Sequence, residues 1–318
     1  MAREFDFLIN AEVIVDDVSV AERVFVDALG FPEPRPAWSG KEPGYGFTFL
    51  FARVHPSLKV SPTRIEAMAL APVDPAVDPR RTLPFLPNIF AAQGNRPWKT
   101  HANELSCSDI DAVHARLMQR GCTVYEMPRD SDAVPFARLW LGWSGDDLKT
   151  YSSDTDGGLF LEICETNALL TSEQDFRNPA PVPDLAPGAM VRVLRRSWIV
   201  PDLRETLSLL DHNLDWQPAA EPALDADRGV LRAVFRFVHP YSAELELVQP
   251  VAAGEIRESL DTWGPGSWAI RIGVNDLAAK TDDLRRRGTE FETLGNGAVV
   301  RVDTGARGVP GLFEFSTV

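Results

Sequence analysis

The feature that most constrains the fold is a pattern of strand, helix and three strands that occurs four times along the 318 residues. In each copy an apolar strand leads into an aspartate that begins a helix, and the copy ends in an alternating strand with a central glutamate. The aspartates are Asp17, Asp109, Asp202 and Asp276, and the glutamates are Glu66, Glu162, Glu246 and Glu314. A repeated supersecondary unit defines an architecture before any single motif does. The sequence therefore predicts four βαβββ modules.

One of these closing strands follows a turn-forming run, Asp154–Gly158, and carries Glu162. Side chains alternate faces along a strand, so Phe160, Glu162 and Cys164 share one face. A carboxylate on an otherwise apolar strand is costly to bury unless it has a partner. We therefore expect Glu162 to meet a metal ion, a cation or a hydrogen-bond donor.

A proline-rich segment, 178–188, divides the four modules into two pairs. The chain is long enough for two domains that each bury a core. We expect an N-terminal domain, 1–168, with modules 1–70 and 98–168. The C-terminal domain is expected at 187–318, with modules 187–252 and 264–318.

The overall charge limits the kinds of partner. A formal net charge of −14 and a pI near 4.8 argue against nucleic acid and anionic membrane surfaces. The start of the chain is charged and lacks a long apolar run, so we expect no signal peptide or membrane span. Cys107, Cys122 and Cys164 have no CxxC spacing, which favours reduced thiols and a cytoplasmic location.

The four modules, with Ala28-Leu29-Gly30-Phe31 closing the first helix and Asp154-Thr155-Asp156-Gly157 before a last strand, resemble the vicinal oxygen chelate superfamily. This superfamily includes glyoxalases, bleomycin-resistance proteins and extradiol dioxygenases. The resemblance implies an α+β fold in which the modules pair into two cup-shaped mixed-sheet domains. It also implies a divalent metal in a cup, held from the first and last strands of each paired module. The aligned positions of the first cup are Asn10, Glu66, Ala102 and Glu162.

Strand alternation indicates which further side chains enter the first cup. In both first strands the apolar residues should face the helix, leaving Asn10, Glu12 and Glu104 inward. Carboxylates crowded in one concavity repel unless they are protonated or bound to a cation. We therefore predict a metal site for Mg²⁺ or Mn²⁺, or for Zn²⁺, Ni²⁺ or Fe²⁺ if a histidine joins. Its candidate ligands are Asn10, Glu12, Glu66, His101, Glu104 and Glu162.

Two alternatives stay open for this cup. His101 lies one residue before the aligned position, so alternation turns it toward the helix, and a structural histidine is the simplest interpretation. A bulge would rotate it inward and complete an amide, Glu, His, Glu set similar to that of glyoxalase I. The second alternative is a cup without metal, in which the glutamates pair with Arg64, Arg138 or water.

The second cup has arginines near the ligand positions. Arg195 and Arg271 should face Glu246 and Glu314, and such ion pairs would repel a divalent metal. We expect this domain to be structural, with a pocket for an anionic ligand as the alternative. Neither cup offers the two aligned histidines that extradiol dioxygenases use.

An aromatic stripe, Tyr45, Phe47, Phe49 and Phe51, is most simply core. If it faced the cup it would form an apolar wall for an aromatic substrate. The candidate substrate-lining residues are Phe47, Phe49, Arg138, Trp140 and Tyr151.

The resemblance implies a metal-dependent isomerase or lyase of the glyoxalase type, acting on a small oxygenated organic molecule, aromatic or not, through an enediolate-like intermediate. Glu162 or Glu66 would be the base, with Glu162 preferred. One alternative is a metal-free binding protein for an aromatic or cationic small molecule. Another is a ring-cleaving dioxygenase with unusual ligands. Such folds also pair across subunits, so a homodimer is an open alternative.

Overall fold

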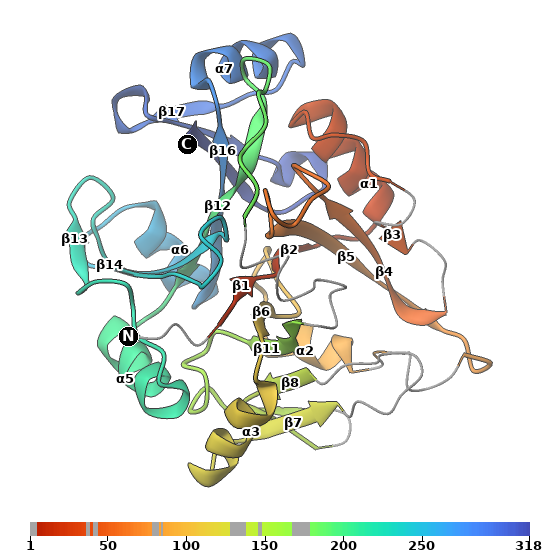
Figure 1. Ribbon diagram of the computed structural model, residues 1–318, viewed down its shortest axis with the longest axis vertical. Helices are drawn as coiled ribbons and strands as arrows, with labels where there is room; N and C mark the ends of the chain where they lie inside the picture. The colour runs from red at the N-terminus through yellow and green to blue at the C-terminus, as the bar shows by residue number, and fades with distance from the viewer. Residues whose placement is uncertain are drawn as a thin grey trace.

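The computed structural model describes residues 5–35, 39–40, 44–77, 83, 85–127, 138–145, 148–166 and 179–318. It is an α+β structure of curved mixed sheets, with α1, α3, α5 and α7 packed against their outer faces (Figure 1). The predicted fold class is therefore confirmed. The predicted domain boundary cannot be followed through residues 167–178, which lie outside the described ranges.

The first module forms a four-stranded sheet. Its first and last strands run parallel to each other, and the other two strands follow antiparallel. In order across the sheet the strands are β2 (Asn10–Ile14), β5 (Arg64–Val73), β4 (Tyr45–Ala52) and β3 (Ser39–Gly40). Helix α1 (Val18–Arg23) begins at Asp17 and continues as a π-helical turn, Val24–Ala28.

The second module supplies four strands of a five-stranded sheet, and the N-terminal segment adds the fifth as an edge strand. Helix α2 (Leu86–Ala92) precedes it and α3 (Ile110–Gln119) covers its outer face. Strands β9 (Trp143–Ser144) and β10 (Thr150–Tyr151) pair antiparallel in a separate two-stranded sheet. In order across the sheet the strands are β1 (Phe7–Leu8), β6 (Asn103–Cys107), β11 (Leu161–Glu165), β8 (Arg138–Leu141) and β7 (Val124–Met127).

The two sheets meet along the N-terminal segment. Strands β1 and β2 are one extended stretch interrupted only at Ile9, with β1 paired to β6 and β2 paired to β5. The Ile9 amide donates to the Glu104 carbonyl at 2.9 Å, and the Ile9 carbonyl accepts from the Arg64 amide at 3.1 Å. The two first strands, β2 and β6, therefore lie next to each other at the junction of the sheets.

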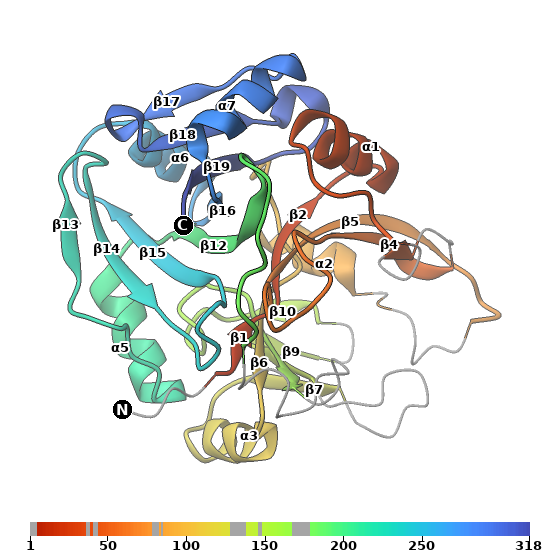
Figure 2. The same cartoon turned by 45° about the horizontal axis from the view of Figure 1, so that its top comes forward.

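The third and fourth modules share one eight-stranded sheet that curls into a half-barrel (Figure 2). The two first strands pair antiparallel at its centre, and each runs parallel to its own last strand. In order across the sheet the strands are β13 (Ala223–Asp225), β14 (Val230–Phe235), β15 (Glu244–Pro250), β12 (Met190–Ile199), β16 (Gly266–Val274), β19 (Leu312–Thr317), β18 (Val299–Asp303) and β17 (Glu292–Leu294). The helices are α5 (Leu203–Leu214), α6 (Glu255–Trp263) and α7 (Leu277–Arg286).

The two halves of the chain are joined by buried contacts. Lys280 of α7 donates from Nζ to the Leu29 carbonyl at 2.6 Å, and both residues are buried. On the other side, Asn213 of α5 donates from Nδ2 to the main-chain carbonyls of Asp154 and Thr155 at 2.9 and 2.8 Å. One hydrophobic cluster contains buried side chains from all four modules. The halves therefore share a continuous core.

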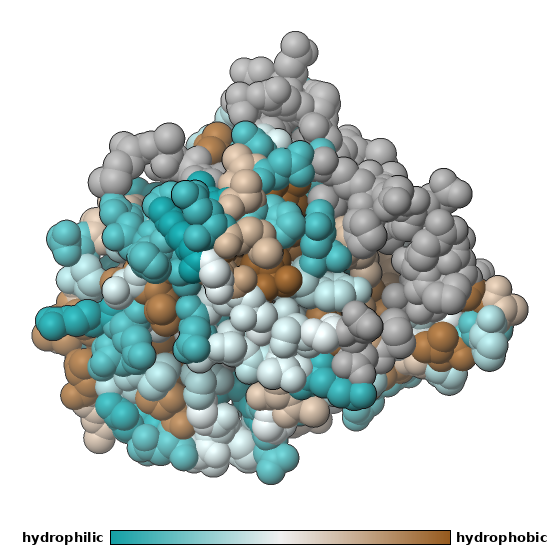
Figure 3. Space-filling view, turned by 90° about the horizontal axis from the view of Figure 1, so that it is seen from below, coloured by the Kyte–Doolittle hydropathy of each residue, from teal (hydrophilic) through white to brown (hydrophobic). Residues whose placement is uncertain are grey.

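The described surface is mainly hydrophilic in the view from below, with hydrophobic residues in small groups (Figure 3). None of the helices in the described ranges combines the length and the hydrophobicity needed to cross a lipid bilayer.

Candidate metal centre

The strand register gathers four carboxylates at the junction of the two N-terminal sheets. Glu12 of β2 lies directly opposite Glu66 of β5, and Glu104 of β6 lies directly opposite Glu162 of β11. Residues opposite each other in neighbouring strands project from the same face. All four side chains are buried. The alternation argument therefore placed these residues on the correct face.

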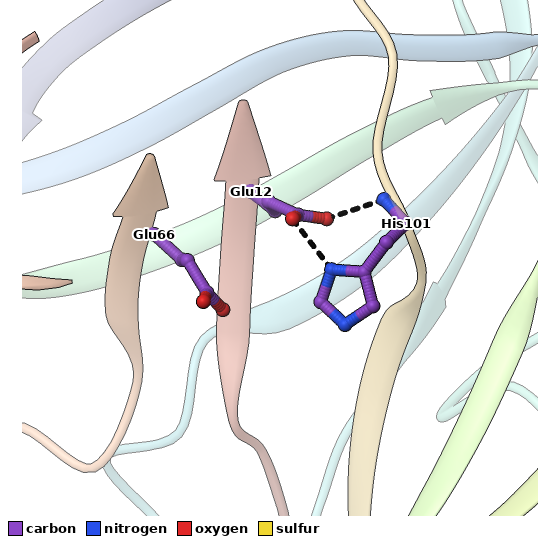
Figure 4. Close-up of side chains that lie close together, drawn as sticks. All are labelled: Glu12, Glu66 and His101. Carbon is purple, nitrogen blue, oxygen red and sulfur yellow. Dashed lines mark hydrogen bonds and ion pairs between the residues drawn. The ribbon is translucent and has the colours of Figure 1, made fainter. Parts of the chain in front are cut away.

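His101 joins the carboxylates from a bend just before β6. Its main-chain amide donates to Glu12 Oε2 at 2.6 Å, and its Nδ1 lies 2.5 Å from Glu12 Oε1 (Figure 4). Its Nε2 lies 3.0 Å from Glu104 Oε1 and 3.2 Å from Glu162 Oε2. The expectation that His101 points toward the helix is wrong. Strand β6 begins only at Asn103, so alternation does not apply to His101 and no bulge is needed to turn it inward.

Glu12 orients this histidine. Its carboxylate also accepts a hydrogen bond from Thr100 Oγ1 at 2.5 Å, so both of its oxygens are occupied by residues 100 and 101. A carboxylate bound to one ring nitrogen fixes the tautomer and presents the other nitrogen to a metal. Glu12 therefore fits an orienting position behind His101 better than a ligand position. Nothing in the sequence indicated that Thr100 belongs to this cluster, because Thr100 precedes strand β6, and only the alternation within strands predicted the site residues.

Asn10 bridges the two pairs of carboxylates. Its Nδ2 lies 2.5 Å from Glu66 Oε2 and 2.5 Å from Glu104 Oε2, while its Oδ1 accepts from Arg64 Nε at 2.6 Å. The oxygen that would bind a metal is thus directed at Arg64. The aligned position in the second module, Ala102, has no ligand atom in its side chain.

The electrostatics of the cluster favour bound positive charge. Burial raises the pKa of Glu66 well above its usual range, and the neighbouring Glu104 and Glu12 raise it further. Burial alone would lower the pKa of His101, but the adjacent Glu12 and the hydrogen bonds to Glu104 and Glu162 raise it strongly. Burial would raise the pKa of Glu104, yet its bond to His101 lowers it overall. A cation or protons must therefore offset the carboxylates.

The donor atoms suit a transition metal. His101, Glu104 and Glu162 each offer a ligand atom, and these atoms lie within 4.8 Å of one another. The same holds for Glu12, Glu66 and His101. One imidazole with several carboxylates matches the preferences of Mn²⁺, Fe²⁺, Zn²⁺ and Ni²⁺. Because Glu12 holds Nδ1, the residues that would hold a metal are His101 through Nε2, Glu66, Glu104 and Glu162.

Arginines lie at the edge of the cluster. Arg138 Nε is 3.4 Å from Glu162 Oε1, and the guanidinium of Arg64 packs 3.5 Å above the ring of Phe51. The thiol of Cys164 contacts Glu162 Oε1 at 3.6 Å from the other side. The glutamates are thus partly paired, as the alternative without metal expected.

The aromatic stripe of β4 lines the cup. Phe51 lies opposite Glu66 in the sheet, so Phe47 and Phe49 alternate onto the same face, where all three are half-buried. Leu50 and Ala52 fill the hydrophobic core from the other face. The stripe thus shares the face of Glu66, while Phe47 also packs against the hydrophobic core, as the core interpretation expected. Its role as an apolar wall for a substrate stays a prediction.

The two other aromatic residues predicted to line the substrate, Trp140 and Tyr151, lie in different places. Trp140 lies opposite Glu162 and packs beside His101, with ring centroids 5.6 Å apart. Tyr151 instead stacks on Phe160 at 4.4 Å and donates its hydroxyl to Asp156 at 2.6 Å. Trp140 thus belongs to the site, whereas Tyr151 belongs to a separate aromatic cluster.

The second cup contains ion pairs at the equivalent positions. Arg195 and Arg228 lie 3.1 and 3.0 Å from Glu246. Arg271 and Arg301 lie 2.6 and 3.1 Å from Glu314. The predicted pairing is confirmed. Arg232 also lies 3.5 Å from Glu246, so this glutamate is paired with three guanidinium groups and Glu314 with two.

Among the solved structures that match, two examples align with nearly the whole chain. A mutant of 4-hydroxymandelate synthase from Streptomyces coelicolor matches at 16% identity and a TM-score of 0.58, covering 98% of this chain and 92% of that one. The Mn(II)-bound glyoxalase from Novosphingobium aromaticivorans matches at 12% identity and a TM-score of 0.55, covering 99% and 83%. No protein-family model matches the sequence, and neither does any curated protein. The likeness concerns the fold, and on that ground this chain has the vicinal oxygen chelate fold, assembled from four βαβββ modules.

Proposed function

We propose that this protein is a metal-dependent isomerase or lyase of the glyoxalase type, acting on a small oxygenated and aromatic organic molecule. The observation that carries the proposal is the arrangement around His101: Nδ1 is held by Glu12 while Nε2 faces Glu104 and Glu162. A carboxylate behind a metal-binding histidine is a common device for orienting it. The Mn(II)-bound glyoxalase with the same fold adds support for manganese.

When bound, a divalent metal would supply Lewis-acid polarisation of a substrate oxygen. The protein's own residues would do the rest. Glu162 or Glu66 would move the proton, since a buried carboxylate beside the substrate suits general acid–base catalysis. Phe47, Phe49 and Phe51 would hold an aromatic ring, and Trp140 would help to exclude water. Arg64 and Arg138 would face negative charge on the substrate.

The first experiment is metal analysis. Protein treated with EDTA and then dialysed is mixed with Mn²⁺, Mg²⁺, Zn²⁺ or Ni²⁺, and melting temperature and metal content are followed. We expect one metal per chain and a higher melting temperature with at least one of these ions. Glu162→Gln should remove most of this effect. The matched control is Glu246→Gln, the equivalent position of the third module, which should keep the metal. No response to any ion in the wild type would refute the metal proposal.

A second candidate is a binding protein that uses no metal. It is favoured by the contacts that the carboxylates already make: hydrogen bonds with Asn10 and His101, and an ion pair with Arg138. The two candidates differ in turnover. If ligands that stabilise the wild type are returned unchanged after prolonged incubation, the binding function is favoured. A ring-cleaving dioxygenase would in addition require bound iron by elemental analysis.

Three further expectations stay predictions. The free cysteines fit a reducing compartment such as the cytoplasm. The acidic chain still argues against nucleic-acid and membrane partners. A homodimer remains open to measurement by light scattering.

A further inference from the structure

The C-terminal half of the chain contains a cavity of about 460 Å³ whose charged side chains are mainly arginines. Its lining comes from β12, β15 and β16, which are neighbours in the half-barrel (Figure 2), and from the segment between β14 and β15. Its charged lining consists of four arginines, Arg192, Arg195, Arg236 and Arg271, and one carboxylate, Glu244. The lining thus has more cationic than anionic side chains, in a chain whose formal net charge is −14.

Two of the four arginines are already used by the fold. Arg195 lies between Glu244 and Glu246, at 2.8 and 3.1 Å. Arg271 donates from Nε and Nη2 to Glu314 at 3.0 and 2.6 Å. These two guanidinium groups are therefore fixed in position, and the carboxylates that they contact balance their charge.

The other two arginines, Arg192 and Arg236, have N–H donors that could bind a ligand. Arg236 is largely exposed and bonds Glu244 through Nε alone, at 2.8 Å. Arg192 stacks over the ring of Tyr241 at 4.7 Å, and among the described residues no carboxylate lies within ion-pair distance of it. A guanidinium carries five N–H donors in a planar fork that matches the oxygens of a carboxylate or a phosphate. Arg192 and Arg236 thus present unused donors at one cavity.

The remaining lining is mixed: Leu194, Phe237 and Pro240 are apolar, whereas His239 and Ser242 are polar. Phe237 is fully buried in the core, and Leu194 is half-buried beside it. The 237–242 loop is fixed to the N-terminal strand, because the His239 amide donates to the Asp6 carbonyl at 2.8 Å and the Leu8 amide donates to Ser242 Oγ at 3.0 Å. The cavity is therefore formed by anchored elements and combines cationic, polar and apolar side chains.

We propose that this cavity binds a small organic anion. Its carboxylate or phosphate would contact Arg192 and Arg236, and its apolar part would pack against Leu194 and Phe237. Charge-assisted, bidentate contacts of this kind are among the stronger polar interactions in proteins. This site is distinct from the candidate metal centre, and its existence does not depend on the proposed function.

The test uses the full-length chain and two anionic probes, phenyl phosphate and benzoate, with neutral benzamide as the matched uncharged probe. EDTA-treated and dialysed protein is titrated calorimetrically at low salt. We expect saturable binding of at least one anion, no binding of benzamide, and weaker binding at high salt. Arg192→Gln and Arg236→Gln should each weaken binding by about tenfold. The control Arg285→Gln, which breaks an exposed ion pair with Asp282 on α7, should leave it unchanged.

Each other outcome is decisive. No saturable binding of either anion would overturn the proposal. Binding that survives the double variant Arg192→Gln/Arg236→Gln would also overturn it, provided circular dichroism shows the variant to be folded. Binding that is lost in Glu162→Gln but kept in Arg192→Gln would assign the anion to the first cup. Because the metal content is measured separately, failure here leaves the proposed function untouched.

Discussion

At the scale of single residues, the contact between Glu12 and His101 distinguishes Glu12 from the other carboxylates of the candidate centre. Glu12 Oε1 meets Nδ1, and Oε2 receives the main-chain amide of His101 and the hydroxyl of Thr100. Glu162, by contrast, faces Nε2. The two glutamates therefore have different expected roles, although each lies at a strand position that alternation had marked.

The substitution Glu12→Gln tests that difference. The new side chain would keep one acceptor oxygen but turn an amide NH₂ toward donors on residues 100 and 101, so the imidazole would lose its fixed orientation. We expect metal affinity to fall by about 10- to 100-fold while the stoichiometry at saturation stays unchanged. Competition with a chelating dye measures both quantities. A loss of stoichiometry would instead make Glu12 a direct ligand.

Glu246 allows a prediction about pH. Although burial opposes ionisation, Arg228 and Arg195 lower the pKa of Glu246 from 4.5 to about 2. A carboxyl whose folded pKa lies below its unfolded value contributes stability above the unfolded value, and this is lost as pH falls through the folded value. The contribution at pH 7 is on the order of 3 kcal/mol.

We therefore expect Glu246→Gln to lower the free energy of unfolding near neutral pH. The difference from wild type should shrink as the pH falls from 4.5 toward 2, where the wild-type carboxyl is protonated as well. Urea unfolding of both proteins at several pH values measures this. A difference that is independent of pH would assign the cost to packing rather than to charge.

The sequence predicted the carboxylates of the site but not the way in which they are used. Glu12, Glu66, Glu104 and Glu162 lie inside regular strands, so alternation fixed their direction. His101 and Thr100 precede a strand, where only tertiary contacts decide direction. Phe47 and Phe49 show a different limit. Alternation indicates which residues share a face, but it does not tell which face meets the helix.

At the scale of elements, the four modules begin their helices in the same way. The carboxylates of Asp17, Asp109, Asp202 and Asp276 each accept a main-chain amide of the first helical turn. Such N-caps satisfy amides that have no partner within the helix. The spacing is short in every module: Asp17 accepts the amide two residues on, and the other three aspartates accept the amide three residues on. The repeat could therefore be predicted from the sequence, because each cap is a local interaction.

One cap can be tested against a control of equal charge. Asp202→Ala removes the acceptor for the Glu205 amide at 3.0 Å and should lower the free energy of unfolding by about 1 kcal/mol. Asp227→Ala removes the same charge from an exposed turn and should cost much less. Urea unfolding compares the two. Equal costs would contradict a specific capping role.

At the scale of the whole molecule, contacts between the first and fourth modules join the halves. Lys280 and Thr289 donate to the carbonyls of Leu29 and Ala28, both in the segment that ends the first helix. Every residue has a main-chain carbonyl, so these acceptors produce no recognisable pattern in the sequence. The packing of the two halves could therefore not be predicted from the sequence. The modules were predictable because each repeats a local pattern.

Lys280→Met tests this connection. Methionine would fill similar space but leave the buried Leu29 carbonyl without its donor, which should lower the free energy of unfolding by about 1 to 3 kcal/mol. Because the halves share a core, tryptophan fluorescence and far-ultraviolet circular dichroism should still report one transition. Two separated transitions in the wild type would show that the halves fold independently.

The segment that contains β1, Ile9 and β2 sets the strand register in both N-terminal sheets. Phe7 and Leu8 pair in register with β6, whereas Asn10 and Glu12 pair in register with β5. A single alanine inserted after Ile9 would leave the first pairing intact. In the pairing of β2 with β5, the insertion would either turn Asn10 and Glu12 to the opposite face of the sheet or force the extra residue to bulge out of the strand. This position is thus a point where the length of the chain, rather than the identity of any side chain, determines whether the two halves of the candidate centre come together.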